Sequence, residues 1–194
     1  GIGNFTGSAP ETWKIQAATD NDWTEKPNVT NCTYGKTPAV TMGTAKHGNV
    51  TVNYTTKDGN TSFGETVPTD AGDYKAVFTV ERTGNYNGLS ETVDFTIAKA
   101  DAQFTAPTAK KGLIYDGENQ ELINPGYSDD GTFKYWLQYE ADSTEIPKGT
   151  DAGKYTVYYQ LIGDQNHKDG NVSQIDVEIA PKNISKATVT LGDS

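Results

Sequence analysis

Alternation of apolar and polar residues is the clearest pattern in this chain, and it predicts β-strands. Residues 74–80 and 93–97 alternate in this way, and residues 155–161 and 175–179 repeat the pattern further along. A period of two puts successive side chains on opposite faces of a strand, so each run has one buried face. No stretch keeps the helical i, i+3, i+4 spacing for more than about one turn. We therefore expect an all-β protein with almost no helix.

Turn residues separate the alternating runs. Asp-Gly pairs end at Gly59, Gly117, Gly131 and Gly170. We expect a positive φ at these glycines, because only glycine adopts it without strain. Prolines that a central strand would not tolerate occur between the runs, at Pro68, Pro125 and Pro147.

One block of sequence recurs at a near-constant step. Asp70-Ala-Gly-Asp-Tyr74 returns as Asp151-Ala-Gly-Lys-Tyr155. Gly84-Asn85-Tyr86 has a weaker counterpart at positions 165–167 and a closer one at positions 3–5. The step is the same for both motifs, since 151 − 70 = 81 and 165 − 84 = 81. A fixed period indicates that one structural unit has been copied.

The period divides the chain into two units and two end segments. We predict domains at 17–99 and 100–182, with the linker in the Ala/Lys stretch near residue 99. Residues 1–16 then correspond to the terminal strand of a preceding repeat, and 183–194 to the first strand of a following one. Unpaired strands add to neighbouring sheet edges, so we expect residues 1–16 to pack on the first domain through Trp13 and Ile15.

The recurrent Asp-x-Gly-x-Tyr motif resembles the corner that opens strand F of immunoglobulin domains. In that corner the tyrosine hydroxyl ties the strand to upstream backbone. The residues that match are Asp70, Gly72 and Tyr74 in the first unit and Asp151, Gly153 and Tyr155 in the second. Ala76 and Val157 stand where antibody domains have cysteine, so apolar packing replaces the disulfide. We predict two tandem immunoglobulin-like β-sandwich domains.

Four motifs of the second unit, taken in order, resemble one family. They lie at residues 113–117, 131–135, 146–155 and 163–167. They are similar to the tandem immunoglobulin-like modules, called MBG or YDG repeats, of large bacterial cell-surface and adhesin-like proteins. The first unit departs from the pattern, with Tyr34-Gly35-Lys36 in place of Tyr-Asp-Gly. The resemblance implies an extracellular location on a bacterial surface and a structural or adhesive role, and it transfers no catalytic residue.

Charge and composition narrow the possible partners. The 194 residues carry a formal net charge of −10, which argues against nucleic acid and against anionic lipid surfaces. No apolar run approaches the roughly 18 residues that a membrane span needs, so we expect no membrane insertion. Cys32 is the only cysteine, and we interpret it as a small core residue.

An aromatic pair in the second unit is the best candidate for a binding site. Alternation places Phe133, Tyr135 and Leu137 on the inner face of one strand, and Val157, Tyr159 and Leu161 on that of another. Trp136 and Tyr158 then share the outer face, flanked by Gln138 and Gln160, where flat rings and amides suit a sugar. Two explanations without a ligand stay open: Trp136 is a buried strand C tryptophan, or the two rings are a stabilising cross-strand pair.

Other candidate sites have simpler explanations. The acidic pairs Asp20/Asp22 and Asp129/Asp130 lack the loop that calcium needs, so we interpret them as solvated turn residues. His167 aligns with an aromatic residue in the other copies, which indicates a packing position. We therefore expect no cofactor, no metal and no enzymatic activity.

These observations favour a non-enzymatic stalk or spacer module, part of a longer array and monomeric by itself. A host surface protein or a glycan is the partner that such a module would meet. The alternative is a carbohydrate-binding module that acts through the aromatic pair on the second domain.

Overall fold

The computed structural model describes residues 16, 18–138, 142–183 and 185. Every regular element in these residues is a β-strand, and no helix occurs among them. The all-β prediction is therefore confirmed. The expected terminal strands, including Trp13 and Ile15, lie outside the described residues apart from residues 16, 183 and 185.

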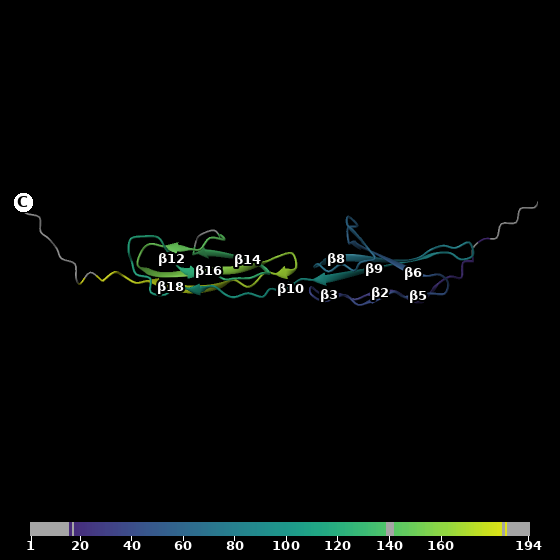
Figure 1. Cartoon of the computed structure of the whole chain (residues 1–194), viewed down its shortest axis with the longest axis horizontal. Helices are drawn as coiled ribbons and strands as arrows, with labels where there is room; N and C mark the ends of the chain where they lie inside the picture. The colour runs from purple at the N-terminus through teal and green to yellow at the C-terminus, as the bar shows by residue number, and fades with distance from the viewer. Residues whose placement is uncertain (1–15, 17, 139–141, 184, 186–194) are drawn as a thin grey trace, which may run out of the picture. The chain divides into compact units, whose positions relative to one another are not determined.

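Eighteen strands occur in the described part of the chain, and Figure 1 labels many of them. Those of the first half are β1 (Trp23–Glu25), β2 (Asn28–Val29), β3 (Cys32–Thr33), β4 (Val40–Thr41), β5 (Thr44–Ala45), β6 (Val50–Thr56), β7 (Ser62–Gly64), β8 (Gly72–Val80) and β9 (Leu89–Ala98). Those of the second half are β10 (Ala100–Asp101), β11 (Thr108–Ala109), β12 (Gln120–Glu121), β13 (Ile123–Asn124), β14 (Gly131–Leu137), β15 (Lys148–Gly149), β16 (Gly153–Gly163), β17 (His167–Lys168) and β18 (Ser173–Ile179).

The chain folds into two compact units. The first contains the described residues up to Cys32 together with Thr37–Pro68 and Asp73–Thr96. The second contains the described residues from Ile97 onward together with Thr33–Lys36 and Thr69–Gly72. The two short segments matter below, because they place one copy of the Asp-Ala-Gly motif and Tyr34 in the second unit.

A five-stranded sheet in the order β3-β9-β8-β6-β7 dominates the first unit. Its alternating strands bury one face, as the period-two pattern predicts. β6 and β8 pair over seven positions, from Val50 opposite Val80 to Thr56 opposite Tyr74. The pairs β1-β5 and β2-β4 supply the opposing layer. The buried apolar residues of this unit are Val29, Tyr54, Tyr74, Ala76, Phe78, Val80 and Phe95.

The second unit is a sandwich of the same kind. The sheet β14-β16-β18 forms one layer, and the pairs β11-β13 and β12-β15 form the other. Leu122 and Ile123 from the second layer pack into a single cluster with the inner face of the first. The remaining buried members of the cluster are Phe133, Tyr135, Val157, Leu161, Val177 and Ile179. Both units are immunoglobulin-like β-sandwiches, which confirms the predicted fold class.

The glycine predictions are right at two positions and wrong at two. Gly59 and Gly117 have φ values of 78° and 88°, as expected for Asp-Gly turns. Gly131 and Gly170 do not have a positive φ. At Gly131 the requirement is space, because a Cβ there would lie 2.2 Å from the Ile162 carbonyl oxygen on the paired strand. The prolines at 68, 125 and 147 lie outside the strands, as predicted.

Candidate functional site

The outer face of the sheet β14-β16-β18 carries the residues singled out as a binding surface. Trp136 on β14 lies directly opposite Tyr158 on β16, and Tyr158 lies opposite Gln174 on β18. Phe133 and Tyr135 are buried on the inner face, where alternation expected them. Trp136 and Tyr158 are not part of the core cluster.

The two outer rings contact each other. The ring centroids of Trp136 and Tyr158 are 6.0 Å apart, and the ring planes differ by 15°. Both side chains are half-buried instead of fully exposed, since each ring covers part of the other. The structure thus brings together the two aromatic residues that the sequence singled out, on a face that the core does not use.

The polar residues that flank the aromatic pair differ in whether other residues already hold their side chains. The Gln160 side-chain amide donates a hydrogen bond of 2.9 Å to the Gly170 carbonyl oxygen, which fixes its orientation. Lys134 forms an ion pair with Asp142, at 3.4 Å. Gln138 follows the end of β14 and is exposed. Gln138 is therefore better placed than Gln160 to meet a molecule that lies on the rings.

A hollow of about 330 Å³ opens on the same sheet. Thr156 and Asp176 line it from paired positions on β16 and β18, and the Thr156 hydroxyl donates a hydrogen bond of 2.8 Å to Asp176. Lys154 and Glu178 form the next pair on the same face of these two strands. Hydroxyl, carboxylate and ammonium groups thus continue the face beyond the aromatic pair. Such groups can form hydrogen bonds with a polar ligand.

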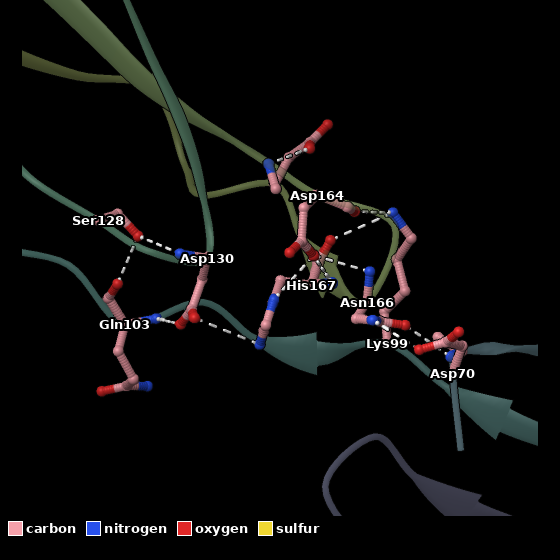
Figure 2. A network of polar contacts seen from close by, with 11 residues as sticks. Asp70, Lys99, Gln103, Ser128, Asp130, Asp164, Asn166 and His167 are labelled. Atoms are coloured by element: carbon pink, nitrogen blue, oxygen red, sulfur yellow. Dashed lines mark hydrogen bonds and ion pairs between the residues drawn. The ribbon is translucent and has the colours of Figure 1, made fainter.

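A second candidate, a polar network in the second unit, surrounds a turn formed by residues 164–167, here called the Asn166 turn (Figure 2). The Asp164 carboxylate accepts hydrogen bonds from the backbone N–H groups of Asn166 and His167, at 2.7 and 2.9 Å. The Asn166 side chain reaches the Asp-Ala-Gly motif at residues 70–72. Its oxygen accepts a hydrogen bond of 2.8 Å from the Ala71 N–H, and its amide donates one of 3.1 Å to Asp70.

His167 is held from several sides in this network. Its Nδ1 lies 2.8 Å from Asp164 and its Nε2 lies 3.6 Å from Asp130. The edge of its ring meets Tyr34 at a centroid distance of 5.2 Å. Only 13% of its side chain is exposed, so it packs as the sequence alignment indicated.

Charge and backbone groups further stabilise the turn. The Asn166 N–H, and after it the His167 side chain, lower the pKa of Asp164 below its usual value. The Lys99 ammonium donates to the Asp164 and His167 carbonyl oxygens, at 2.7 and 3.2 Å. Several hydrogen bonds, to side-chain and backbone groups, therefore hold the Asn166 turn.

The corner tyrosines lie at matching positions of the two sheets. The Tyr155 hydroxyl donates a hydrogen bond of 2.7 Å to the Asp151 carbonyl oxygen, four residues upstream. Tyr74 is buried and stacks on Phe95 at a centroid distance of 5.5 Å. The hydrogen bond from Tyr155 to the Asp151 carbonyl oxygen fixes the backbone of the Asp-Ala-Gly motif at residues 151–153.

Sequence reasoning missed the role of Asn166. The signal was present, because Asn85 and Asn166 are the constant residues of the recurrent turn motif. What the sequence did not reveal was the contact between the two recurrent motifs, since Asn166 and Ala71 are 95 residues apart.

The remaining acidic candidates have protein partners. Asp20 forms an ion pair of 2.8 Å with Lys46, and Asp129 accepts a hydrogen bond from the Tyr127 hydroxyl. Within the residues described, no group of three or more His, Cys, Asp or Glu side chains could hold a metal ion. Those residues also include no helix long and apolar enough to cross a membrane. Cys32 is half-buried in β3, so it is not among the fully buried core residues.

Comparisons with known proteins give only distant similarities. No family model and no curated protein matches the chain. Among solved structures, the chain is similar to fibronectin(III)-like modules of Clostridium thermocellum CbhA, with 13% identity and a TM-score of 0.32, over 90% of this chain and 100% of that one. It is also similar to Drosophila N-cadherin EC1-3, with 11% identity and a TM-score of 0.32, over 83% of this chain and 66% of that one. At this level of superposition neither similarity carries an argument about function.

Proposed function

We propose that this chain is a non-enzymatic structural or adhesive module, a pair of spacer repeats of a bacterial cell-surface protein. The duplicated all-β fold supports the proposal, and so does the resemblance of four ordered motifs to tandem surface modules. A spacer must keep its fold while tension passes along the chain. The pairing of the strands nearest the ends of each repeat is therefore the relevant feature.

The observation that carries this proposal is a parallel pairing between the early and the final parts of the second unit. Ile114 pairs in parallel with Ala180, which directly follows β18. The Tyr115 N–H donates to the Ala180 carbonyl oxygen at 2.8 Å, and the Ala180 N–H donates to Leu113 at 2.9 Å. Opposite pulls on the two ends of a parallel pair act in shear. Shear loads these hydrogen bonds together instead of opening them one at a time.

The segment that leads into each repeat is fastened in the same way. Ala100 pairs in parallel with His167 in the second unit, and Ala18 pairs in parallel with Tyr86 in the first. The two pairs occupy equivalent positions, since 100 − 18 = 82 and 167 − 86 = 81. Repetition of this attachment is what an array that bears load along its length requires.

Force spectroscopy on the intact chain tests the proposal. We expect two separate unfolding events, and Ala180→Pro should lower the force of one of them because proline removes the N–H that bonds Leu113. A chemical denaturation curve for each variant separates this loss of mechanical resistance from a general loss of stability. Val172→Pro is the matched control, since Val172 is exposed and lies outside the strands. Equal forces for the Ala180→Pro and control variants would contradict a load-bearing role.

A second candidate function is carbohydrate binding. It is favoured by the position of Trp136 and Tyr158, which stack on each other outside the core and beside the hollow lined by Thr156 and Asp176. Flat aromatic rings next to hydrogen-bonding groups suit the apolar face and the hydroxyl groups of a sugar. Gln138 would supply an additional amide.

A glycan array probed with the intact chain distinguishes the two functions. A binding surface predicts specific signals that Trp136→Ala abolishes with little loss of stability, whereas a core tryptophan would cost about 3–5 kcal/mol. Tyr127→Ala is the control, because Tyr127 is 65% exposed and does not belong to this face. If no sugar gives a signal, carbohydrate binding is contradicted and the spacer function is the remaining candidate.

A further inference from the structure

Two neighbouring hollows open on the second unit, and one aromatic residue, Phe104, lines both of them. The first, here called the Tyr127 hollow, has a volume of about 330 Å³ and is lined by residues 103–105 and 127–130. The second, here called the Asn171 hollow, has a volume of about 440 Å³ and is lined by residues 101, 102, 104, 168–171 and 173. Both volumes fall within the range of known ligand sites. Neither of the functions proposed above uses these hollows.

Large apolar side chains are exposed around the two hollows. Tyr127 is 65% exposed and Phe104 is 47% exposed. Val172, which lies between two residues of the Asn171 hollow, is 54% exposed. Single exposed apolar residues are ordinary on a protein surface, whereas a group of them beside a hollow is typical of an interaction site.

The first unit carries different residues at the same position. Trp23 corresponds to Phe104 and Lys46 corresponds to Tyr127, since 104 − 23 = 81 and 127 − 46 = 81. Trp23 is half-buried, and the Lys46 ammonium forms an ion pair of 2.8 Å with Asp20. The repeat therefore accepts a charged residue where the second unit has Tyr127. The exposed tyrosine is a feature of the second unit and not a requirement of the fold.

Hydrogen bonds hold the walls of the Tyr127 hollow. Thr105 and Tyr127 exchange backbone hydrogen bonds of 2.8 and 3.0 Å. Figure 2 shows how Ser128 and Asp130 hold the Gln103 backbone. The Ser128 hydroxyl donates to the Gln103 carbonyl oxygen at 2.7 Å, and the Asp130 carboxylate accepts from the Gln103 N–H at 2.7 Å. The shape of this hollow therefore does not depend on a ligand.

Phe104 is anchored on the core of the second unit. Its ring lies roughly perpendicular to the ring of buried Phe133, at a centroid distance of 5.7 Å. This contact restricts the motion of Phe104, whose exposed part stands between the two hollows. A ligand that covers the exposed part therefore has little side-chain freedom to remove.

The polar groups around Phe104 include both donors and acceptors of hydrogen bonds. Each hollow has an amide, a hydroxyl and a carboxylate group, from Gln103, Thr105 and Asp129 in the first and from Asn171, Ser173 and Asp169 in the second. A cation needs acceptors alone and an anion needs donors alone, whereas a sugar hydroxyl both donates and accepts. The net charge of −10 further disfavours an acidic sugar. The mixed set of groups thus favours a neutral sugar.

We propose that the Tyr127 and Asn171 hollows bind a neutral oligosaccharide that passes over Phe104. The apolar face of one sugar ring would lie against the exposed part of Phe104, and Tyr127 would contact a ring in the first hollow. Sugar hydroxyl groups would form hydrogen bonds with Gln103 and Asp129 in one hollow and with Asn171 in the other. Phe104 and the two hollows are here called the Phe104 site.

The Phe104 site goes beyond both functions proposed above. It shares no residue with the face that carries Trp136 and Tyr158. The spacer function fails or holds independently, because force spectroscopy measures the chain without sugar. On the glycan array, a signal that Tyr127→Ala removes and Trp136→Ala leaves belongs to the Phe104 site. A signal with the reverse dependence belongs to the aromatic pair.

Nuclear magnetic resonance on the ¹⁵N-labelled intact chain tests the Phe104 site. The probes are soluble tetrasaccharides of glucose, mannose, galactose and N-acetylglucosamine, each raised to millimolar concentration, with tetralysine as a cationic probe. We expect at least one sugar to shift the backbone amides of Thr105, Tyr127 and Asn171 along one saturable curve. The indole N–H of Trp136 reports separately on the other face.

Two variants remove the aromatic contacts one at a time. Phe104→Ala should abolish the shifts in both hollows. Because Phe104 also contacts Phe133, Tyr127→Ala provides a second variant, at a side chain that does not belong to the core cluster. It should weaken binding by about tenfold, the value of one aromatic contact. Tyr127→Phe keeps the ring and should bind nearly as tightly as the wild type.

The matched control is Tyr115→Ala, which removes an exposed aromatic residue that lines neither hollow and should bind as the wild type does. No saturable shift of the three amides with any of the four sugars overturns the proposal. Shifts that persist unchanged in both Phe104→Ala and Tyr127→Ala overturn it as well, because the sugar would then lie elsewhere. Shifts with tetralysine and with no sugar also overturn it, since the carboxylates alone would then select the ligand.

Discussion

The two repeats share a backbone frame but place the contacts between their inner aromatic rings at different ends of it. In the first unit Phe95 contacts Tyr54 and Tyr74 at the corner end of the sheet, with centroid distances of 6.1 and 5.5 Å. In the second, Phe133 contacts Tyr135 and Tyr159 at the end away from the corner, at 5.8 and 6.2 Å. The register of each sheet fixes these positions: Tyr74 pairs with Thr56, whereas Phe133 pairs with Leu161.

At equivalent positions of the two repeats, large and small core residues are exchanged. Phe95 of the first unit corresponds to Val177 of the second, and Val50 of the first corresponds to Phe133 of the second. Large and small residues have thus changed places along the same strands. A close-packed interior requires the volumes of neighbouring side chains to match. The backbone frame is therefore duplicated, whereas the packing of the core side chains is particular to each unit. Residues at equivalent positions are not interchangeable.

The largest expected effect tests this packing at Phe95. Phe95 is only 2% exposed and stacks on Tyr74, so Phe95→Ala should destabilise the first unit by about 3–5 kcal/mol. Val177→Ala removes fewer carbon atoms from the equivalent place and should cost less. Calorimetry should show one transition of the intact chain moving to lower temperature, and hydrogen exchange identifies the unit that melts.

Phe95→Val sharpens the same test, because it installs the residue that the second unit uses. It should still destabilise the first unit, since the smaller side chain loses contacts with Tyr54 and Tyr74. A neutral effect of Phe95→Val would show that the two cores tolerate each other's residues, contrary to the comparison.

A smaller effect is expected at a hydrogen bond that only one repeat has. The Tyr135 hydroxyl oxygen accepts a bond of 3.0 Å from the Gly126 N–H, whereas the equivalent residue of the first unit is Val52, without a hydroxyl. Tyr135 is 3% exposed, and burial raises the pKa of its phenol. Tyr135→Phe leaves a donor without its acceptor and should cost about 1–3 kcal/mol.

Urea denaturation of Tyr135→Phe measures this cost in the second unit, and Tyr158→Phe is the control. The Tyr158 hydroxyl has no hydrogen-bond partner in the part of the chain that the structure describes, so its removal should change little. Equal stability of the two variants would mean that water replaces Tyr135 at Gly126.

The corner tyrosines give the next prediction. The Tyr155 hydroxyl bonds the Asp151 carbonyl oxygen at 2.7 Å, on a half-buried side chain. Tyr155→Phe should therefore cost about 0.5–1.5 kcal/mol, the usual net value of one hydrogen bond. It should also speed the exchange of the backbone amides at residues 151–153 in a hydrogen-exchange experiment. Loss of stability with unchanged exchange at these residues would assign the effect to packing.

Period-two alternation was enough to predict the fold class and the faces of the strands. Phe133 and Tyr135 are buried and Trp136 is outside the core, because side-chain direction follows directly from position in an extended chain. The half-burial of Trp136 and Tyr158 was not predictable, since it depends on the rotamers with which the two rings meet.

The contacts of the Asn166 turn could not be predicted from the sequence either. The repeat period identified Asn166 and the Asp-Ala-Gly motif as recurrent features. It did not indicate that one copy of each meets the other, because that contact depends on the fold and joins residues 95 and 96 positions apart. Gly131 illustrates the same limit. Local turn rules predicted a positive φ there, but glycine is required because a Cβ would clash with Ile162 on the paired strand.

The smallest expected effect compares the two copies of the Asp-Ala-Gly motif within one molecule. The Ala71 N–H donates to Asn166 and should exchange slowly, whereas the Ala152 N–H has no partner among the described residues and should exchange fast. Asn166→Ala should speed Ala71 exchange by about fivefold for each kcal/mol that the bond contributes, and leave Ala152 unchanged. Asn171→Ala should change neither amide. Similar exchange rates for Ala71 and Ala152 in dilute wild-type protein would show that the hydrogen bond to Asn166 does not protect Ala71 in solution, contrary to the difference between the two copies of the motif.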